Sequence, residues 1–132
     1  MKIKQCSLEI EDLIHQKIRE YNRQFFSDTE DLSLYLSDDD DQWIGGIVAS
    51  RTHDGIDIEF LFVEESFRGM GYGTFLLQSI EKKAVELHVK RIMLNTYEFQ
   101  SLDFYLKNGY LVFGQLSPCF KEYSQYFLKK EM

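Results

Sequence analysis

The chain has 132 residues, the length of one ordinary domain, and its 44% apolar content can build a core without disulfides or metals. Its net charge of −7 argues against nucleic acid as a partner, because basic surface drives phosphate-backbone binding. No apolar run approaches the ~18 residues of a membrane span. The first residues also lack the apolar segment of a signal peptide, so we expect a cytoplasmic protein with no membrane partner.

The pattern of apolar residues and turn signals predicts a single domain over residues 1–132. The expected strands are Lys2–Leu8, Asp31–Leu36, Trp43–Ser50, Ile56–Val63, Arg91–Tyr97, Tyr110–Leu116 and Glu122–Leu128. The expected helices are one that Ser7 or Glu9 opens and that ends near Ser27-Asp28, then Gly71–His88 and Gln100–Asn108. This order predicts an α/β fold of the α+β type, a mixed sheet of six or seven strands with helices on both faces.

The strand Ile56–Val63 has the strongest alternation in the chain. Strict alternation assigns Ile56, Ile58, Phe60 and Phe62 to one face, and Asp57, Glu59, Leu61 and Val63 to the other. Two carboxylates are therefore expected on the same face of this strand.

A glycine-rich segment, Arg68-Gly69-Met70-Gly71-Tyr72-Gly73, joins this strand to the next helix. Glycines let the backbone turn tightly, and the free N–H groups of a helix N-terminus attract anions, so we expect phosphate or pyrophosphate binding. The spacing is neither G-x-G-x-x-G of dinucleotide sites nor the P-loop pattern. A glycine turn without a ligand is the remaining alternative.

Two cysteines, Cys6 and Cys119, have neither C-x-x-C spacing nor histidines at metal-ligand intervals. We expect two reduced thiols and no metal, although a disulfide between them stays open.

The glycine segment resembles the R/Q-x-x-G-x-G/A loop of the GNAT superfamily of N-acetyltransferases, with Arg68, Gly71 and Gly73 at its fixed places. A second segment, Phe104 to Tyr110, resembles the F-Y-x-K-x-G-F/Y motif of the same superfamily. The two motifs follow in the family's order and at its usual separation. The resemblance covers about residues 56–116.

The resemblance implies that acetyl-CoA is the acyl donor. Its pyrophosphate would rest on backbone amides of the loop, and Arg68 would position the loop or the phosphates. Its pantetheine arm would pair with the backbone of Phe62 and Val63. The amides expected at the pyrophosphate belong to Gly69, Met70, Gly71, Tyr72, Gly73 and Thr74.

The resemblance also implies a catalytic set. Tyr105 would protonate the leaving thiolate, with simple packing as its alternative role. Glu59, or Asp57 as second choice, would accept the proton of the acceptor amine; binding a substrate cation or facing solvent are the alternatives. Glu98 departs from the pattern, because many relatives carry a cofactor-contacting asparagine there.

The expected function is acetyl transfer to a primary amine of a small molecule or peptide, directly within a ternary complex. Two alternatives stay open: a CoA-binding or CoA-sensing domain without turnover, and a partner-binding domain without CoA. The resemblance also suggests a homodimer. The sequence does not identify the acceptor.

Overall fold

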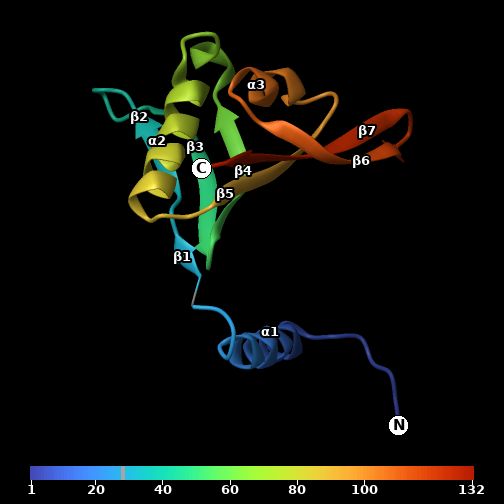
Figure 1. Cartoon of the computed structure of the whole chain (residues 1–132). Coiled ribbons are helices and arrows are strands. Elements are labelled where there is room, and N and C mark those ends of the chain that lie inside the picture. Colours follow the sequence, from blue (N-terminus) through green and yellow to red (C-terminus); the bar gives the residue numbers. More distant parts are fainter. Residues whose placement is uncertain (28) are drawn as a thin grey trace.

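The protein folds as a seven-stranded mixed sheet with helices, as a computed structural model of residues 1–27 and 29–132 shows (Figure 1). The strand order is β1-β3-β4-β5-β7-β6, and β2 also pairs with β3. Only β4 and β5 run parallel. The elements are α1 (Leu8–Asn22), β1 (Glu30–Asp31), β2 (Leu34–Ser37), β3 (Trp43–Thr52), β4 (Gly55–Val63), a 3-10 turn (Glu65–Phe67), α2 (Tyr72–Glu86), β5 (Arg91–Tyr97), α3 (Leu102–Lys107), β6 (Leu111–Phe120) and β7 (Tyr123–Glu131). The predicted fold class is confirmed.

The N-terminal part differs from the prediction. The strand expected over Lys2–Leu8 is wrong: residues 1–7 have no secondary structure and are exposed, and none of the described strands pairs with them (Figure 1). The first helix begins at Leu8, where the Ser7 hydroxyl accepts a hydrogen bond from the Ile10 amide at 3.3 Å. It ends at Asn22, before the predicted end near Ser27-Asp28, and Asp28 lies outside the described residues.

A β-bulge interrupts the hairpin of β3 and β4. Ala49 pairs with Ile58 and Val48 pairs with Phe60, so Glu59 is an extra residue in β4. A bulge bends its strand and increases the local twist. The bulge therefore changes both the direction of β4 and the faces of the residues after it.

The second half of β4 has its faces reversed relative to the prediction. Leu61 and Val63 pack against the hydrophobic core, on the same side as Ile56. Phe60 and Phe62 are 68% and 48% exposed on the opposite side. The predicted assignment of these residues was wrong because strict alternation counts no extra residue.

The bulge is followed by a parting of the two central strands. β4 pairs with β5 only from Gly55 to Asp57, although β4 continues to Val63. β5 pairs with β7 along its whole length, from Arg91 to Tyr97. The second half of β4 therefore has β3 on one side and an open space on the other.

α2 carries the main core and crosses from β4 to the parallel β5. Its buried residues cluster with Ile47, Ile56 and Ile92 of the strands. Burying each such side chain stabilises the fold by about 1.5–3 kcal/mol, so this contact fixes the start of α2 at the end of β4. The buried positions of α2 are Leu76, Leu77, Ile80 and Ala84.

A polar contact fixes the end of α3. Gly109 takes the left-handed conformation (φ 88°) predicted for a residue that ends a helix. The following Tyr110 is buried, and its hydroxyl donates to Glu81 of α2 at 3.3 Å. Lys130 of β7 donates to the same carboxylate at 2.9 Å and to the Asn108 carbonyl at 2.9 Å. α3 is therefore tied to α2 and to β7.

Gly45 marks the closest approach of β3 to β4. A Cβ atom there would lie 2.9 Å from the Val63 Cα and against the Phe62 carbonyl group. We expect Gly45→Ala to lower the free energy of unfolding by about 1–3 kcal/mol, because backbone cannot move aside as a side chain can. Urea unfolding followed by circular dichroism measures this.

The matched control is Gly55→Ala in the same hairpin, where the nearest atom to the new Cβ would be the Arg91 carbonyl oxygen at 3.7 Å. We expect it to be neutral or slightly stabilising. An equal loss in both variants would contradict the steric argument.

Candidate active site

The glycine loop lies where β4 ends and α2 begins. Gly69 and Gly71 have φ angles of 76° and 87°, which side chains other than glycine rarely adopt. Gly71 is the N-cap of α2. The first hydrogen bond of the helix runs from the Phe75 amide to the Gly71 carbonyl, at 2.9 Å. The first-turn amides of α2, from Tyr72 on, thus have no partner within the helix. The loop presents these donors at the positive end of the helix.

Gly73 brings three elements together. A Cβ there would contact the Phe104 ring of α3 at 3.5 Å and the Val63 side chain of β4 at 3.9 Å. The absence of a side chain leaves the first turn of α2 close against both. The loop is therefore held between the strand and the short helix.

Arg68 binds the strand below the loop. Its Nε–H donates to the Val63 carbonyl at 2.9 Å, and its guanidinium lies 5.3 Å from the centre of the Phe62 ring. The Trp43 ring also stacks on Phe62, at 5.9 Å between centroids. Arg68 thus fixes the end of β4 relative to the loop.

A cleft of about 760 Å³ opens between the separated strands and the glycine loop. It brings together all the predicted cofactor-binding residues except Met70, which lines a neighbouring hollow with Phe75. The lining residues are Leu61, Phe62, Val63, Phe67, Arg68, Gly69, Gly71, Tyr72, Gly73, Thr74, Phe99, Gln100, Ser101 and Phe104.

The sequence reasoning missed the side of the cleft that follows β5. Phe99, Gln100, Ser101 and Phe104 line it, and the Gln100 Oε1 holds the turn by accepting from the Tyr97 amide at 3.0 Å. These residues could have been predicted from the sequence, because they follow a strand expected to run parallel to β4. The carboxyl ends of parallel neighbouring strands meet at one edge of a sheet, where ligands bind.

Tyr105 is buried beside the cleft rather than exposed in its lining. It is 6% exposed, and its ring packs on Phe104 and on Tyr110 at 5.1 and 5.9 Å between centroids. Burial raises the pKa of Tyr105 to about 12. The phenol therefore stays protonated at neutral pH and is available as a hydrogen-bond or proton donor.

The two predicted carboxylates lie on the face of β4 away from α2, and both are exposed. The pKa of Asp57 is raised, first by partial burial and then by the negative charge of Glu59. The structure thus brings the two groups close enough to interact electrostatically.

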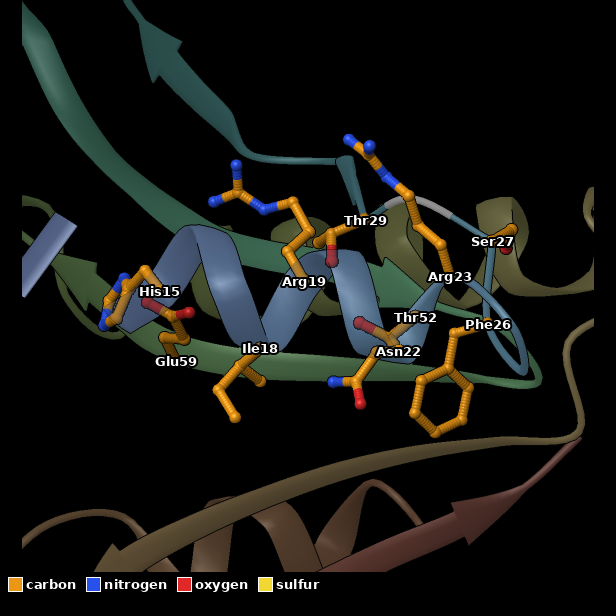
Figure 2. A pocket seen from close by; sticks show the side chains of 10 residues that line it. All are labelled: His15, Ile18, Arg19, Asn22, Arg23, Phe26, Ser27, Thr29, Thr52 and Glu59. Carbon is orange, nitrogen blue, oxygen red and sulfur yellow. The ribbon is translucent and has the colours of Figure 1, made fainter. Parts of the chain in front are cut away.

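A second cavity, of about 850 Å³, lies between α1 and the β3–β4 hairpin (Figure 2). Glu59 contributes a carboxylate to it, whereas Asp57 is not among the described lining residues. The lining consists of His15, Ile18, Arg19, Asn22, Arg23, Phe26, Ser27, Thr29, Thr52 and Glu59. Figure 2 shows that most of these side chains come from α1 and the residues just after it.

Glu98, which departs from the family pattern, has a structural partner. Its Oε1 accepts a hydrogen bond from the Ser124 amide at 2.6 Å, which ties the end of β5 to the β6–β7 hairpin. Asn95 accepts from the Gln125 side chain at 3.1 Å. Both side chains thus bind β7.

Other potential sites are sparse. Cys6 and Cys119 are free, exposed thiols. Within residues 1–27 and 29–132, no three His, Cys, Asp or Glu side chains gather as metal ligands would. None of the helices in the described part of the chain has the length and apolarity needed to cross a membrane.

Comparison with known proteins gives consistent matches. Residues 3–110 match a family model described as the acetyltransferase (GNAT) family. The acetyltransferase Atu2258 of Agrobacterium fabrum is 29% identical over 124 residues, which are 92% of this chain and 90% of that protein.

Solved structures agree in fold. A crystal structure of an acetyltransferase from Bacillus cereus ATCC 14579 superposes with a TM-score of 0.89 at 31% identity and covers 100% of this chain and 98% of its own. PaiA N-acetyltransferase from Thermoplasma acidophilum, solved in complex with coenzyme A, superposes with a TM-score of 0.65 at 20% identity. It covers 92% of this chain and 70% of its own, and shows a shared fold.

The electrostatic contact between the two carboxylates can be tested by titration. We expect a pKa of Asp57 above the ordinary 3.8, and a lower value in Glu59→Gln because the neighbouring charge is gone. NMR of the carboxyl carbons measures both. The raised pKa makes the native state bind the extra proton, so the contribution of Asp57 to stability falls as pH rises through that window.

Glu64→Gln is the matched control, since it removes one negative charge just beyond the other end of β4. It should leave the pKa of Asp57 unchanged. The same shift in both variants would mean that net charge, and not the Glu59 contact, sets the pKa.

Proposed function

The chain belongs to the GNAT family of acetyltransferases, and on that basis we propose that it moves the acetyl group of acetyl-CoA to a primary amine, by direct transfer in a ternary complex. The observation that carries the proposal is the cleft where β4 leaves β5 and meets the first turn of α2. The pyrophosphate and the pantetheine arm of acetyl-CoA each match a part of this cleft.

The pyrophosphate matches the N-terminus of α2. Unpaired amides in the first turn and the positive end of the helix favour a dianionic group. Gly69 and Gly71 leave open space at their Cα atoms, since an added Cβ would meet nothing within 4 Å. A phosphate can therefore approach the loop backbone closely.

The pantetheine arm matches the open side of β4. Beyond Asp57 this strand has no neighbour on the β5 side, so its backbone groups there need other partners. An extended chain with two amides can pair with the backbone near Phe62 and Val63 as an added strand would. Arg68 keeps this stretch in place through the Val63 carbonyl.

The reaction has a balanced path through these groups. The amine nitrogen attacks the thioester carbonyl carbon, the oxyanion takes backbone hydrogen bonds, and the C–S bond breaks. Tyr105 donates to the leaving sulfur, and Glu59, directly or through water, accepts the proton of the attacking amine. Asp57 is the second candidate for the base.

The pKa of Tyr105 limits its part in this path. A thiol has a usual pKa of about 8.5, well below the value of about 12 for the buried phenol. Full proton transfer to a free thiolate would thus be unfavourable. Tyr105 acts mainly as a hydrogen-bond donor that stabilises charge on the sulfur as the bond breaks.

The acceptor side matches the cavity beside Glu59. A carboxylate in a cavity of about 850 Å³ suits a cationic amine, and the net charge of −7 attracts cations to the protein. The cavity also holds Arg19 and Arg23, which suit an acceptor that carries an anionic group as well.

A CoA-binding domain without turnover is the second candidate, and the burial of Tyr105 outside the cleft lining favours it. Both candidates require CoA binding, and only the enzyme requires the Tyr105 hydroxyl. Binding and turnover therefore have to be measured separately.

Acetyl-CoA binding is tested by calorimetry on the wild-type protein and on Thr74→Glu. A carboxylate at this position suits the helix N-terminus but repels the pyrophosphate, so we expect at least tenfold weaker binding by a stable protein. The control is Gln78→Glu, an equal charge at an exposed position of the same helix, which should bind as the wild type does. Wild-type protein that binds no acetyl-CoA would refute the proposal.

Turnover is tested with Tyr105→Phe in a screen of amine acceptors with acetyl-CoA. We expect kcat to fall by about 10²-fold or more, because losing one hydrogen-bond donor to the charge that develops in the transition state costs about that much, while acetyl-CoA binding is kept. Tyr35→Phe, on the exposed strand β2, should keep full activity. Unchanged kcat in Tyr105→Phe would remove this residue from the mechanism, and no turnover with any amine would favour the non-catalytic candidate.

A further inference from the structure

The chain exposes more surface than a compact protein of its mass. Its accessible surface is 9859 Å² for 15.7 kDa. A compact monomer of this mass exposes about 7,300 Å², so roughly 2,500 Å² is in surplus. A surplus of this size on each chain is ample for a stable protein interface, which buries about 800 Å² per partner.

α1 contributes to the surplus, because it stands apart from the sheet and has no buried residue (Figure 1). Apolar side chains nevertheless recur along it and just beyond it at intervals of three or four residues. Their exposed fractions run from 46% to 65%. The stripe is Ile10, Ile14, Ile18, Tyr21 and Phe25. An amphipathic helix is normally stabilised by covering its apolar face, so this face needs a partner.

The second uncovered surface is the face of β3 and β4 away from α2. Trp43, Val48, Phe60 and Phe62 are between 41% and 68% exposed there. Adjacent apolar side chains of this kind mark an interaction site rather than ordinary surface. The same chain thus carries an uncovered apolar helix and an uncovered apolar sheet face.

The end of the helical segment contacts the β3–β4 turn of the same chain. The Phe26 ring lies 5.9 Å from the His53 ring, which holds the end of the helical segment at the β3–β4 turn. The crystal structure from Bacillus cereus superposes over 100% of this chain with a TM-score of 0.89. Residues 1–27 are about a fifth of the chain, so that score leaves little room for a displaced helix.

We propose that a second copy of this chain covers both surfaces, in a two-fold dimer where α1 of each protomer lies on the open β3–β4 face of the other. Two-fold symmetry makes the contact twice, since the helix and the face are present on both chains. The exposed residues 1–7, which pair with none of the described strands, precede this helix in the chain.

The exchange has a consequence for the active site, which rests on the proposed function. Asp57 lies on the same open face as Phe60, and Glu59 lies between them in the chain. The partner's helix would cover this face and exclude water from it. The acceptor side would then be built by two chains and the acetyl-CoA side by one.

The test uses sedimentation velocity of the full chain over a wide range of concentration. We expect a species of twice the 15.7 kDa chain mass. The helix variant Ile10→Asp/Ile14→Asp and the face variant Phe60→Asp should each weaken the dimer about thirtyfold or more, because charge enters an apolar contact. These side chains are exposed within the chain, so the fold should survive. Val85→Asp, at an equally exposed apolar position of α2, is the control and should remain dimeric.

Mixing the two variants distinguishes a dimer that exchanges α1 between protomers from dimers with another interface. A mixed pair keeps one intact contact, the helix of the face variant on the face of the helix variant. We therefore expect dimer to return in the mixture and in neither variant alone. A monomeric wild type, or a mixture that stays monomeric, would overturn the proposal.

Acetyl-CoA calorimetry on the helix variant keeps this result distinct from the proposed function. The helix variant should bind acetyl-CoA as the wild type does, because α1 is not part of the cleft at the glycine loop. If the wild-type protein bound no acetyl-CoA, the proposed function would be refuted, but the proposed dimer would not be affected.

Discussion

The separation of β4 from β5 after Asp57 is the constraint on which the rest of the structure depends. A strand in the middle of a sheet normally has both of its edges paired, since unpaired backbone groups are costly when buried. Here β4 and β5 pair only at their first residues, Gly55–Asp57 with Arg91–Met93. After these residues each strand keeps a single paired neighbour, β3 for β4 and β7 for β5. The cleft at the glycine loop forms in the open space between β4 and β5.

Several local features serve this separation. The bulge at Glu59 bends β4 away, and Gly45 lets β3 follow the bent strand at close range. Arg68 ties the free end of β4 to the glycine loop through the Val63 carbonyl. On the other side, Glu98 ties the end of β5 to the β6–β7 hairpin through the Ser124 amide. Contacts at the end of β4 and at the end of β5 therefore keep the two strands apart.

The sequence predicted best what short stretches of chain decide. Gly69 and Gly71 were recognisable because left-handed backbone at a helix start is a local requirement, and β5 was predicted with its observed bounds. The faces of Phe60 and Phe62 were not predictable from alternation, because a bulge is a property of two paired strands. The strand expected at residues 2–8 failed for the same reason, since a strand requires an edge to pair with. The burial of Tyr105 depends on Tyr110 and α2, which are distant in the sequence.

The two halves of the proposed reaction are built from parts of different stability. The acetyl-CoA side consists of backbone groups held by the core of α2 and by the tie between Glu81, Tyr110 and Lys130. The acceptor side consists of side chains around Glu59, under a helix that the core does not hold. Changes on α1 can therefore alter the acceptor without disturbing the donor site, as expected when function resides in sites placed on a common fold. In the proposed reaction, the base Glu59 belongs to the acceptor side and Tyr105 to the acetyl-CoA side, so the helix over the acceptor side would have to be held in place. Contact with a second chain would supply that, and would couple assembly of the protein to completion of its active site.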